Sequence, residues 1–147
     1  DLLRRPPRKP GAEIADRDFL AWLAASALLA SACTLGAFAY GLFVARSVET
    51  ARTLAFSTLV VEEVLRSFAL RSRTRILWEV GVFSNVRLAI VALVTVALQV
   101  YSHHAAWLGG LLHSGTLSWP QCIAVTALGF VPVTVLETWK LVRRWSR

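Results

Sequence analysis

One stretch of membrane-spanning length, with three ionisable side chains near its middle, constrains this chain most. It occupies residues 52–72, within ARTLAFSTLVVEEVLRSFALRS, and its charged members are Glu62, Glu63 and Arg66. On a helix that rises 1.5 Å per residue, Glu63 would lie about 16 Å from Arg52, near the middle of a bilayer. Each charge there costs roughly 2.5–3.5 kcal/mol. Neighbouring protein or a water-filled cavity must therefore surround these side chains.

The spacing of the three residues supplies part of their pairing. Arg66 follows Glu62 by four residues and Glu63 by three, so its guanidinium can reach either carboxylate on one helix face. One carboxylate is then paired and the other is left over. Helical geometry does not choose between them. The functional interpretation takes Glu63 as the unpaired carboxylate that binds or passes a cation, and the structural alternative is a buried ion pair plus a protonated carboxylate kept for packing.

The composition indicates a membrane protein. Of the 147 residues 56% are hydrophobic, against roughly 45–50% in soluble domains. The formal net charge is +7, but the Lys and Arg residues form short clusters between long apolar runs. That pattern is typical of orientation in a bilayer and not of a phosphate-binding surface, so we expect no nucleic-acid partner.

Four apolar stretches predict four membrane helices, at residues 19–45, 52–70, 87–106 and 120–142. In the first, Ala32 and Gly36, and then Ala37 and Gly41, stand four residues apart, a spacing that lets helices approach closely in lipid. The short link after this stretch predicts an antiparallel hairpin. The expected fold is all-α, a single domain over residues 1–147 that forms a four-helix transmembrane bundle of antiparallel hairpins.

Positive charge predicts how the bundle is oriented. The N-terminal segment, the loop at residues 71–87 and the C-terminal tail together hold thirteen Lys or Arg residues, whereas the opposite side holds Arg46 and Arg52 alone. The excess predicts that both termini are cytoplasmic. Compact loops favour a multi-pass protein of a bacterial inner (plasma) membrane.

The remaining polar residues give weaker signals. Cys33 and Cys122 lie inside apolar runs and are expected to be small buried residues without a disulfide or metal. His103, His104 and His113 fall in a loop that we interpret as solvated and not as a metal site.

Two features lie on the expected cytoplasmic side of the spans. Trp78 and Phe83 predict a short interfacial segment at headgroup depth. Glu137 and Lys140, three residues apart, predict an interfacial pair that fixes the depth of the last helix.

Four segments of the chain resemble cation pumps of the P-type ATPase superfamily, calcium-pump-like branch. DLLRRPPRKP is similar to the D-x-M-x-R-P-P-R signature after their sixth membrane helix, and ARTLAFSTLVVEEVLRSF resembles their eighth helix. RSRTRILWEVGVFSN is similar to the loop before the ninth helix, and LSWPQCIAVTALGFVPVTVLETWKLVRR to the tenth, with its E-x-x-K ending. The order and spacing of these segments match over essentially the whole chain.

The resemblance implies a C-terminal membrane domain, helices seven to ten of an ATP-driven cation pump, that supports the transport helices. The motifs D-K-T-G-T, T-G-E-S and G-D-G-x-N-D do not occur in this sequence, so we expect no ATPase activity from this chain alone and assign ATP and magnesium to the parent pump. Its implied partners are the lipid bilayer, the remaining transmembrane helices and the cytoplasmic domains.

The resemblance also assigns the ion ligand. It implies that Glu63 contributes a carboxylate to cation or proton binding, together with ligands from the fourth, fifth and sixth helices, and that Glu62 pairs with Arg66. Where relatives have a neutral amide this chain has Arg66, whose positive charge opposes a divalent cation. Calcium is one candidate for the transported cation.

Two other functions fit the sequence. One is a stand-alone four-span membrane protein that acts as an interaction or assembly partner. The other is a small ion or proton channel that uses Glu62, Glu63 and Arg66. An upstream reading frame that encodes D-K-T-G-T would exclude the first, and the absence of conductance from the reconstituted chain would exclude the second.

Overall fold

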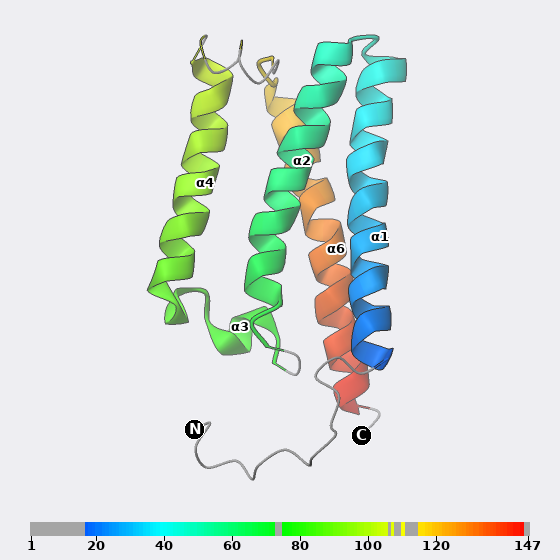
Figure 1. Ribbon diagram of the computed structural model, residues 1–147, viewed down its shortest axis with the longest axis vertical. Helices are drawn as coiled ribbons and strands as arrows, with labels where there is room; N and C mark the ends of the chain where they lie inside the picture. Colours follow the sequence, from blue (N-terminus) through cyan, green and yellow to red (C-terminus); the bar gives the residue numbers. More distant parts are fainter. Residues whose placement is uncertain (1–16, 73–74, 106, 108–109, 111–114, 146–147) are drawn as a thin grey trace.

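The described part of the chain is helical throughout its regular elements. The structure, a computed structural model, describes residues 17–72, 75–105, 107, 110 and 115–145, and no strand occurs among them. The elements are α1 (Arg17–Ala39), the π-helix η2 (Tyr40–Val44), α2 (Val48–Ala69), α3 (Leu77–Val80), the 3₁₀-helix η3 (Val82–Ser84), α4 (Val86–His104) and α6 (Trp119–Trp145) (Figure 1). The all-α class expected from the sequence is therefore correct.

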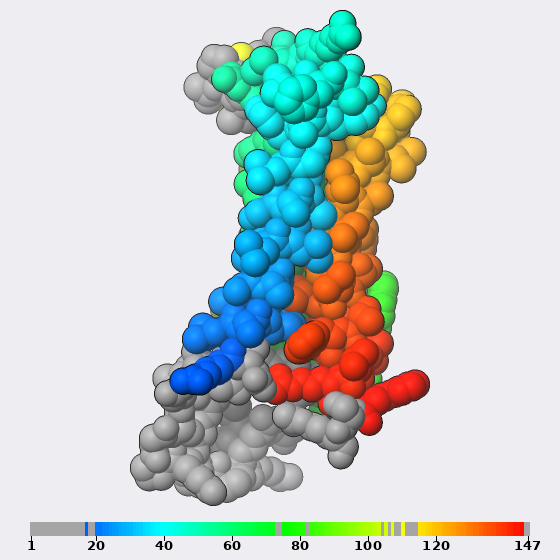
Figure 2. All heavy atoms as spheres, turned by 90° about the vertical axis from the view of Figure 1, so that its right-hand side faces the viewer, coloured from blue at the N-terminus to red at the C-terminus, as the bar shows by residue number. Residues whose placement is uncertain are grey.

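Helices α1, α2 and α6 form the packed core, and α4 stands beside α2 (Figure 1). In the view turned by 90°, α1 and α6 lie side by side along their length (Figure 2). One buried cluster joins Ala37, Leu54 and Val125, one residue from each core helix. The start of α1 and the end of α6 lie at the same end of the molecule (Figure 1).

The link between α1 and α2 is short and has a defined backbone. After η2 only Ala45, Arg46 and Ser47 precede α2. Arg46 takes a left-handed conformation with φ 52°, and the Ser47 hydroxyl accepts a hydrogen bond from the Thr50 backbone N–H at 3.1 Å. Because this N-cap satisfies one of the first free N–H groups, α2 begins at Val48, before the apolar run from residue 52.

Small residues bring α2 into close contact with both core neighbours. Gly41 lies against the backbone of Ala51, and Gly129 of α6 lies against Val61 and the backbone of Glu62. Ala37 is also buried. The second small-residue pair of the first predicted span, with Ala37 in α1 and Gly41 in η2, therefore packs as the sequence indicated.

The first small-residue pair in α1 does not take part in this packing. Ala32 is exposed, and a Cβ atom added at Gly36 would meet nothing within 4 Å. Spacing alone therefore did not identify which pair contacts α2.

Three helical segments are long and apolar enough to cross a membrane: Leu20–Val44, Val86–His103 and Trp119–Trp145. The expected second span, α2, is not among them, because its 22 residues include Glu49, Arg52, Glu62, Glu63 and Arg66. At 1.5 Å per residue α2 is about 33 Å long. This helix is therefore long enough to cross a membrane, but its charged residues make it less apolar than the three segments above.

Candidate functional site

Glu63 and Arg66 form an ion pair on the surface of α2. Arg66 Nη1 donates to Glu63 Oε1 at 2.7 Å. The Glu63 side chain is 56% exposed and the Arg66 side chain 16% exposed. The pair spans three residues of one helix, a spacing at which two side chains lie on the same face. Glu63 thus points away from the three-helix core.

The expected pairing of Arg66 with Glu62 is wrong. Both carboxylates were within reach, but consecutive residues on a helix point about 100° apart, and the core takes only one of them. Glu62 turns inward and is 0% exposed, which leaves Glu63 as the partner of Arg66. Whether either carboxylate binds an ion stays a prediction.

Glu62 connects α2 to α1. The Thr34 hydroxyl of α1 donates to Glu62 Oε2 at 3.0 Å. From the other side, Gly129 of α6 approaches the Glu62 backbone. A buried carboxyl group needs hydrogen-bond partners because it is removed from water, and Thr34 provides one across the helix interface.

The exposed face of α2 forms a stripe that other elements of the described chain do not cover. We call this the outer stripe, and its exposed members are Arg52, Phe56, Leu59, Glu63 and the C-cap residue Leu70. They recur at intervals of three, four or seven residues, the period of one helix face. An apolar surface with an ion pair at its centre therefore points out of the bundle.

No cluster of three or more His, Cys, Asp or Glu residues that could hold a metal ion occurs among the residues that the structure describes. Cys33 and Cys122 are both free and half-buried. His113 and the side chain of His104 lie outside the part of the chain that the structure describes.

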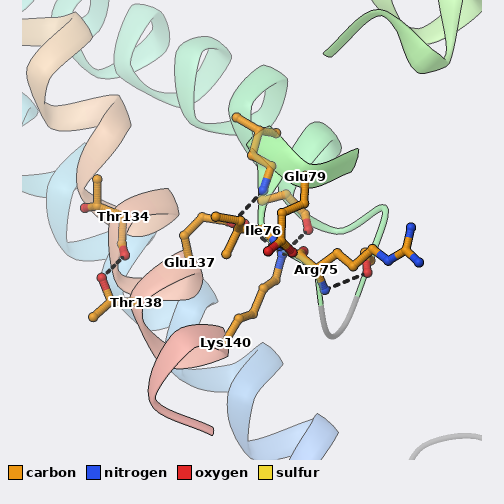
Figure 3. A network of polar contacts seen from close by, with 10 residues as sticks. Arg75, Ile76, Glu79, Thr134, Glu137, Thr138 and Lys140 are labelled. Atoms are coloured by element: carbon orange, nitrogen blue, oxygen red, sulfur yellow. Dashed lines mark hydrogen bonds and ion pairs between the residues drawn. The ribbon is translucent and has the colours of Figure 1, made fainter. Parts of the chain in front are cut away.

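A buried lysine joins the end of α2 to α6, and the sequence had indicated only an interfacial pair. Lys140 is 4% exposed, and its Nζ donates to Ala69 O at 2.7 Å and to Glu137 Oε1 at 2.7 Å (Figure 3). Glu137 Oε2 in turn accepts from the Leu77 backbone N–H at 2.8 Å. The E-x-x-K spacing was visible in the sequence, but its partners about 60–70 residues away were not.

A second, exposed ion pair lies beside this network. Arg144 Nη1 donates to Glu79 Oε1 at 2.8 Å, and Glu79 also accepts from the Ile76 backbone N–H. The hydrogen bond from Arg144 lowers the pKa of Glu79 below its ordinary value. A lowered pKa in the folded state favours folding above the ordinary pKa, and this small contribution is lost as the pH falls through the lowered value.

The opposite end of the bundle holds a polar cluster around His103. This residue lies in the last turn of α4 and is half-buried, not in a solvated loop as expected. Its Nδ1 lies 3.1 Å from Gly115 O, and its Nε2 lies 3.4 Å from Ser57 Oγ. Gln99 donates to Ser57 Oγ at 2.8 Å. In the sequence Gln99 is a polar residue within an apolar run, but its contacts to Ser57 and His103 cannot be read from it.

Comparisons with known proteins identify the family. The family described as "Cation transporting ATPase, C-terminus" matches residues 1–142. Calcium-transporting ATPase 1 of Bacillus cereus (strain ATCC 10987 / NRS 248) is 31% identical over 94 residues, which is 64% of this chain and 11% of that relative. The chain thus spans about a tenth of the length of the relative it matches. With nearly all its residues covered by one family, this chain belongs to the C-terminal domain family of cation-transporting ATPases.

Proposed function

We propose that this chain is the C-terminal membrane domain of an ATP-driven cation pump and that α1, α2, α4 and α6 correspond to transmembrane helices seven to ten. In this proposal both termini are cytoplasmic and the domain supports the transport helices. Glu63 contributes a carboxylate to a cation or proton site completed by other helices. ATP and magnesium act in the cytoplasmic domains of the parent protein, which lies in a bacterial inner membrane.

The depth of Glu63 carries the proposal. On α6, Trp119 and Trp139 are exposed and twenty residues apart, or about 30 Å along the helix. This equals the thickness of the hydrocarbon core, and exposed Trp residues favour its two interfaces. Gly129, midway between them, contacts Val61 and the Glu62 backbone. These contacts support a position near the bilayer centre for the Glu63–Arg66 pair.

At that depth the outer stripe requires a protein partner. An ion pair that faces lipid tails is costly because each charge is removed from water. The remaining transmembrane helices of the pump are the occupant we propose, since the chain covers 11% of its relative. Oxygen ligands on those helices would meet Glu63 across the outer stripe. A stand-alone four-span protein would leave the stripe against lipid, which disfavours that alternative.

Arg66 limits what the site can bind. Its guanidinium, 2.7 Å from Glu63, neutralises the carboxylate and repels cations. A cation that uses Glu63 must displace or tolerate Arg66, so we propose that the site holds fewer positive charges than one with a neutral residue at this position. Calcium remains a candidate because the relative is a calcium-transporting ATPase.

The test is carried out on the complete pump that contains this chain. Hydrogen bonds and contacts to charged groups contribute about 1.5–3 kcal/mol, so Glu63→Gln is expected to weaken the cation dependence of phosphorylation by ATP by about ten- to a hundredfold. Glu62→Gln is the matched control, because it changes the neighbouring carboxylate that faces Thr34. We expect a smaller effect from it.

Two outcomes would contradict this assignment. Equal shifts for the two variants, or a larger shift for Glu62→Gln, would remove Glu63 as the ligand. A spin label at position 59 with lipid-like mobility and high oxygen accessibility in the complete pump would show that lipid covers the outer stripe. The two measurements are independent: the first tests Glu63 as a ligand, and the second tests whether protein covers the outer stripe.

A further inference from the structure

The imidazole of His103 connects three parts of the molecule that are distant in sequence. Nδ1 lies 3.1 Å from Gly115 O, in the segment before α6. Nε2 lies 3.2 Å from Gln99 Nε2 of the same helix and 3.4 Å from Ser57 Oγ of α2. Gly115 also donates its N–H to the Thr53 hydroxyl of α2 at 2.8 Å. One side chain thus links α4, α2 and the segment that leads into α6.

These partners define the protonation state of the ring. A backbone carbonyl only accepts, so Nδ1 must carry the hydrogen toward Gly115 O. An amide nitrogen only donates, so Nε2 must accept from Gln99. With the amide nitrogen of Gln99 turned toward the ring, the contacts fit the neutral Nδ1–H tautomer. The imidazolium form would direct an N–H from Nε2 at the amide nitrogen of Gln99, and that hydrogen bond would be lost. Nε2–H would keep only the longer contact to Ser57 Oγ, at 3.4 Å, as an acceptor.

Loss of this contact would affect α4 more than the other helices. Most apolar side chains of α4, such as Val91, Leu93 and Leu98, are exposed. Gln99 and His103 provide hydrogen bonds from its last turns to α2 and to Gly115. A helix with few buried contacts depends strongly on such bonds.

We propose that His103 is a pH-sensitive latch that holds α4 against α2 at the end of the bundle opposite the Lys140 network. The neutral ring closes the latch, and protonation from that side opens it. Histidine suits this role because an imidazole side chain can gain or lose a proton within the physiological pH range. The latch is independent of the cation site proposed at Glu63.

The charged groups at this end do not replace the lost hydrogen bond. Among the described residues they are Glu49 and Arg52 on α2 and Arg46 before it, while the charged residues of α6 lie at its other end. The Glu49 carboxylate lies against Gly115. The Glu49 carboxylate therefore attracts an imidazolium from the Nδ1 side. It does not relieve the unfavourable contact between the Nε2–H group and the amide nitrogen of Gln99.

The first measurement is solid-state ¹⁵N NMR of the histidine side chains in the complete protein, reconstituted in lipid. At neutral pH we expect His103 to show a protonated Nδ1 and an unprotonated Nε2, assigned by loss of the signals in His103→Phe. A signal from the Nε2–H tautomer or from imidazolium at neutral pH would overturn the proposal. The tautomer is observed in the unmodified protein, and the variant serves only to assign the signals.

The second measurement follows the separation of α4 and α2. Spin labels at the exposed positions 101 and 48 report their distance by pulsed electron resonance. Between about pH 8 and pH 5, a range that spans the ordinary pKa of histidine, we expect the distribution to broaden and move to longer distances. His103→Phe should give the open distribution at both pH values, and the matched variant His104→Gln should keep the response. A constant distribution in the parent protein, or a pH response that persists in His103→Phe, would contradict the latch.

Discussion

Replacing Gly41 by alanine is expected to destabilise the domain more than any other single-methyl change in α1 or η2. The added Cβ would lie 2.6 Å from the backbone nitrogen of Ala51, and no flexible side chain can move aside to admit it. Overpacking of this kind costs about 1–3 kcal/mol, and more where backbone must shift. We expect a clearly lower midpoint of thermal aggregation in detergent for the complete protein.

Gly36→Ala is the matched control. It makes the same chemical change five residues earlier, where the new Cβ meets nothing within 4 Å. Alanine favours helix over glycine by about 1 kcal/mol in soluble hosts, so this variant should be neutral or slightly stabilised. Equal losses at positions 36 and 41 would mean that the contact between η2 and α2 does not determine stability.

Lys140→Met is expected to give the second large effect. The change leaves the Glu137 carboxylate without its cation and the Ala69 carbonyl without its donor at 2.7 Å. Removal of one partner from a fully buried ion pair costs about 3–5 kcal/mol, because the remaining charge stays out of water. The Glu137 side chain is 17% exposed, so we expect a cost at or below the lower end of this range. The thermal midpoint in detergent should fall, and Glu137→Gln added to Lys140→Met should restore part of the loss, since it removes the unpaired charge.

Arg144→Met supplies the comparison on the same helix. It breaks the ion pair with Glu79, in which both side chains are exposed, and exposed pairs contribute little because water and salt screen them. We expect its thermal midpoint to stay close to that of the parent protein. If Lys140→Met and Arg144→Met had equal effects, the network in Figure 3 would be no more than a surface feature.

The helices could be predicted from the sequence because their signals are local. Long apolar runs with a charged cluster at one end or both defined α1, α4 and α6, and the charged run defined α2. The same local reasoning placed Arg66 within reach of both glutamates. It could not choose between them, because the choice depends on which face of α2 meets Thr34 and Gly129.

The contacts of Lys140 and His103 could not be predicted, for the same physical reason. The acceptor at Ala69 is separated from Lys140 by 71 residues, and Ser57 is separated from His103 by 46. No periodicity within one helix records such partners. For Lys140 the available signal was the pair that it forms with Glu137 near the end of the last predicted span, since charges at that position need partners.

The brevity of the connection between α1 and α2 has a mechanical consequence. Three linking residues, with Arg46 in a left-handed conformation, are too few to let one helix shift along the other. The contact between Gly41 and Ala51 opposes such a shift sterically. A movement of α2 along its own axis would therefore move α1 as well. Any displacement felt at Glu63 becomes a movement of the whole hairpin.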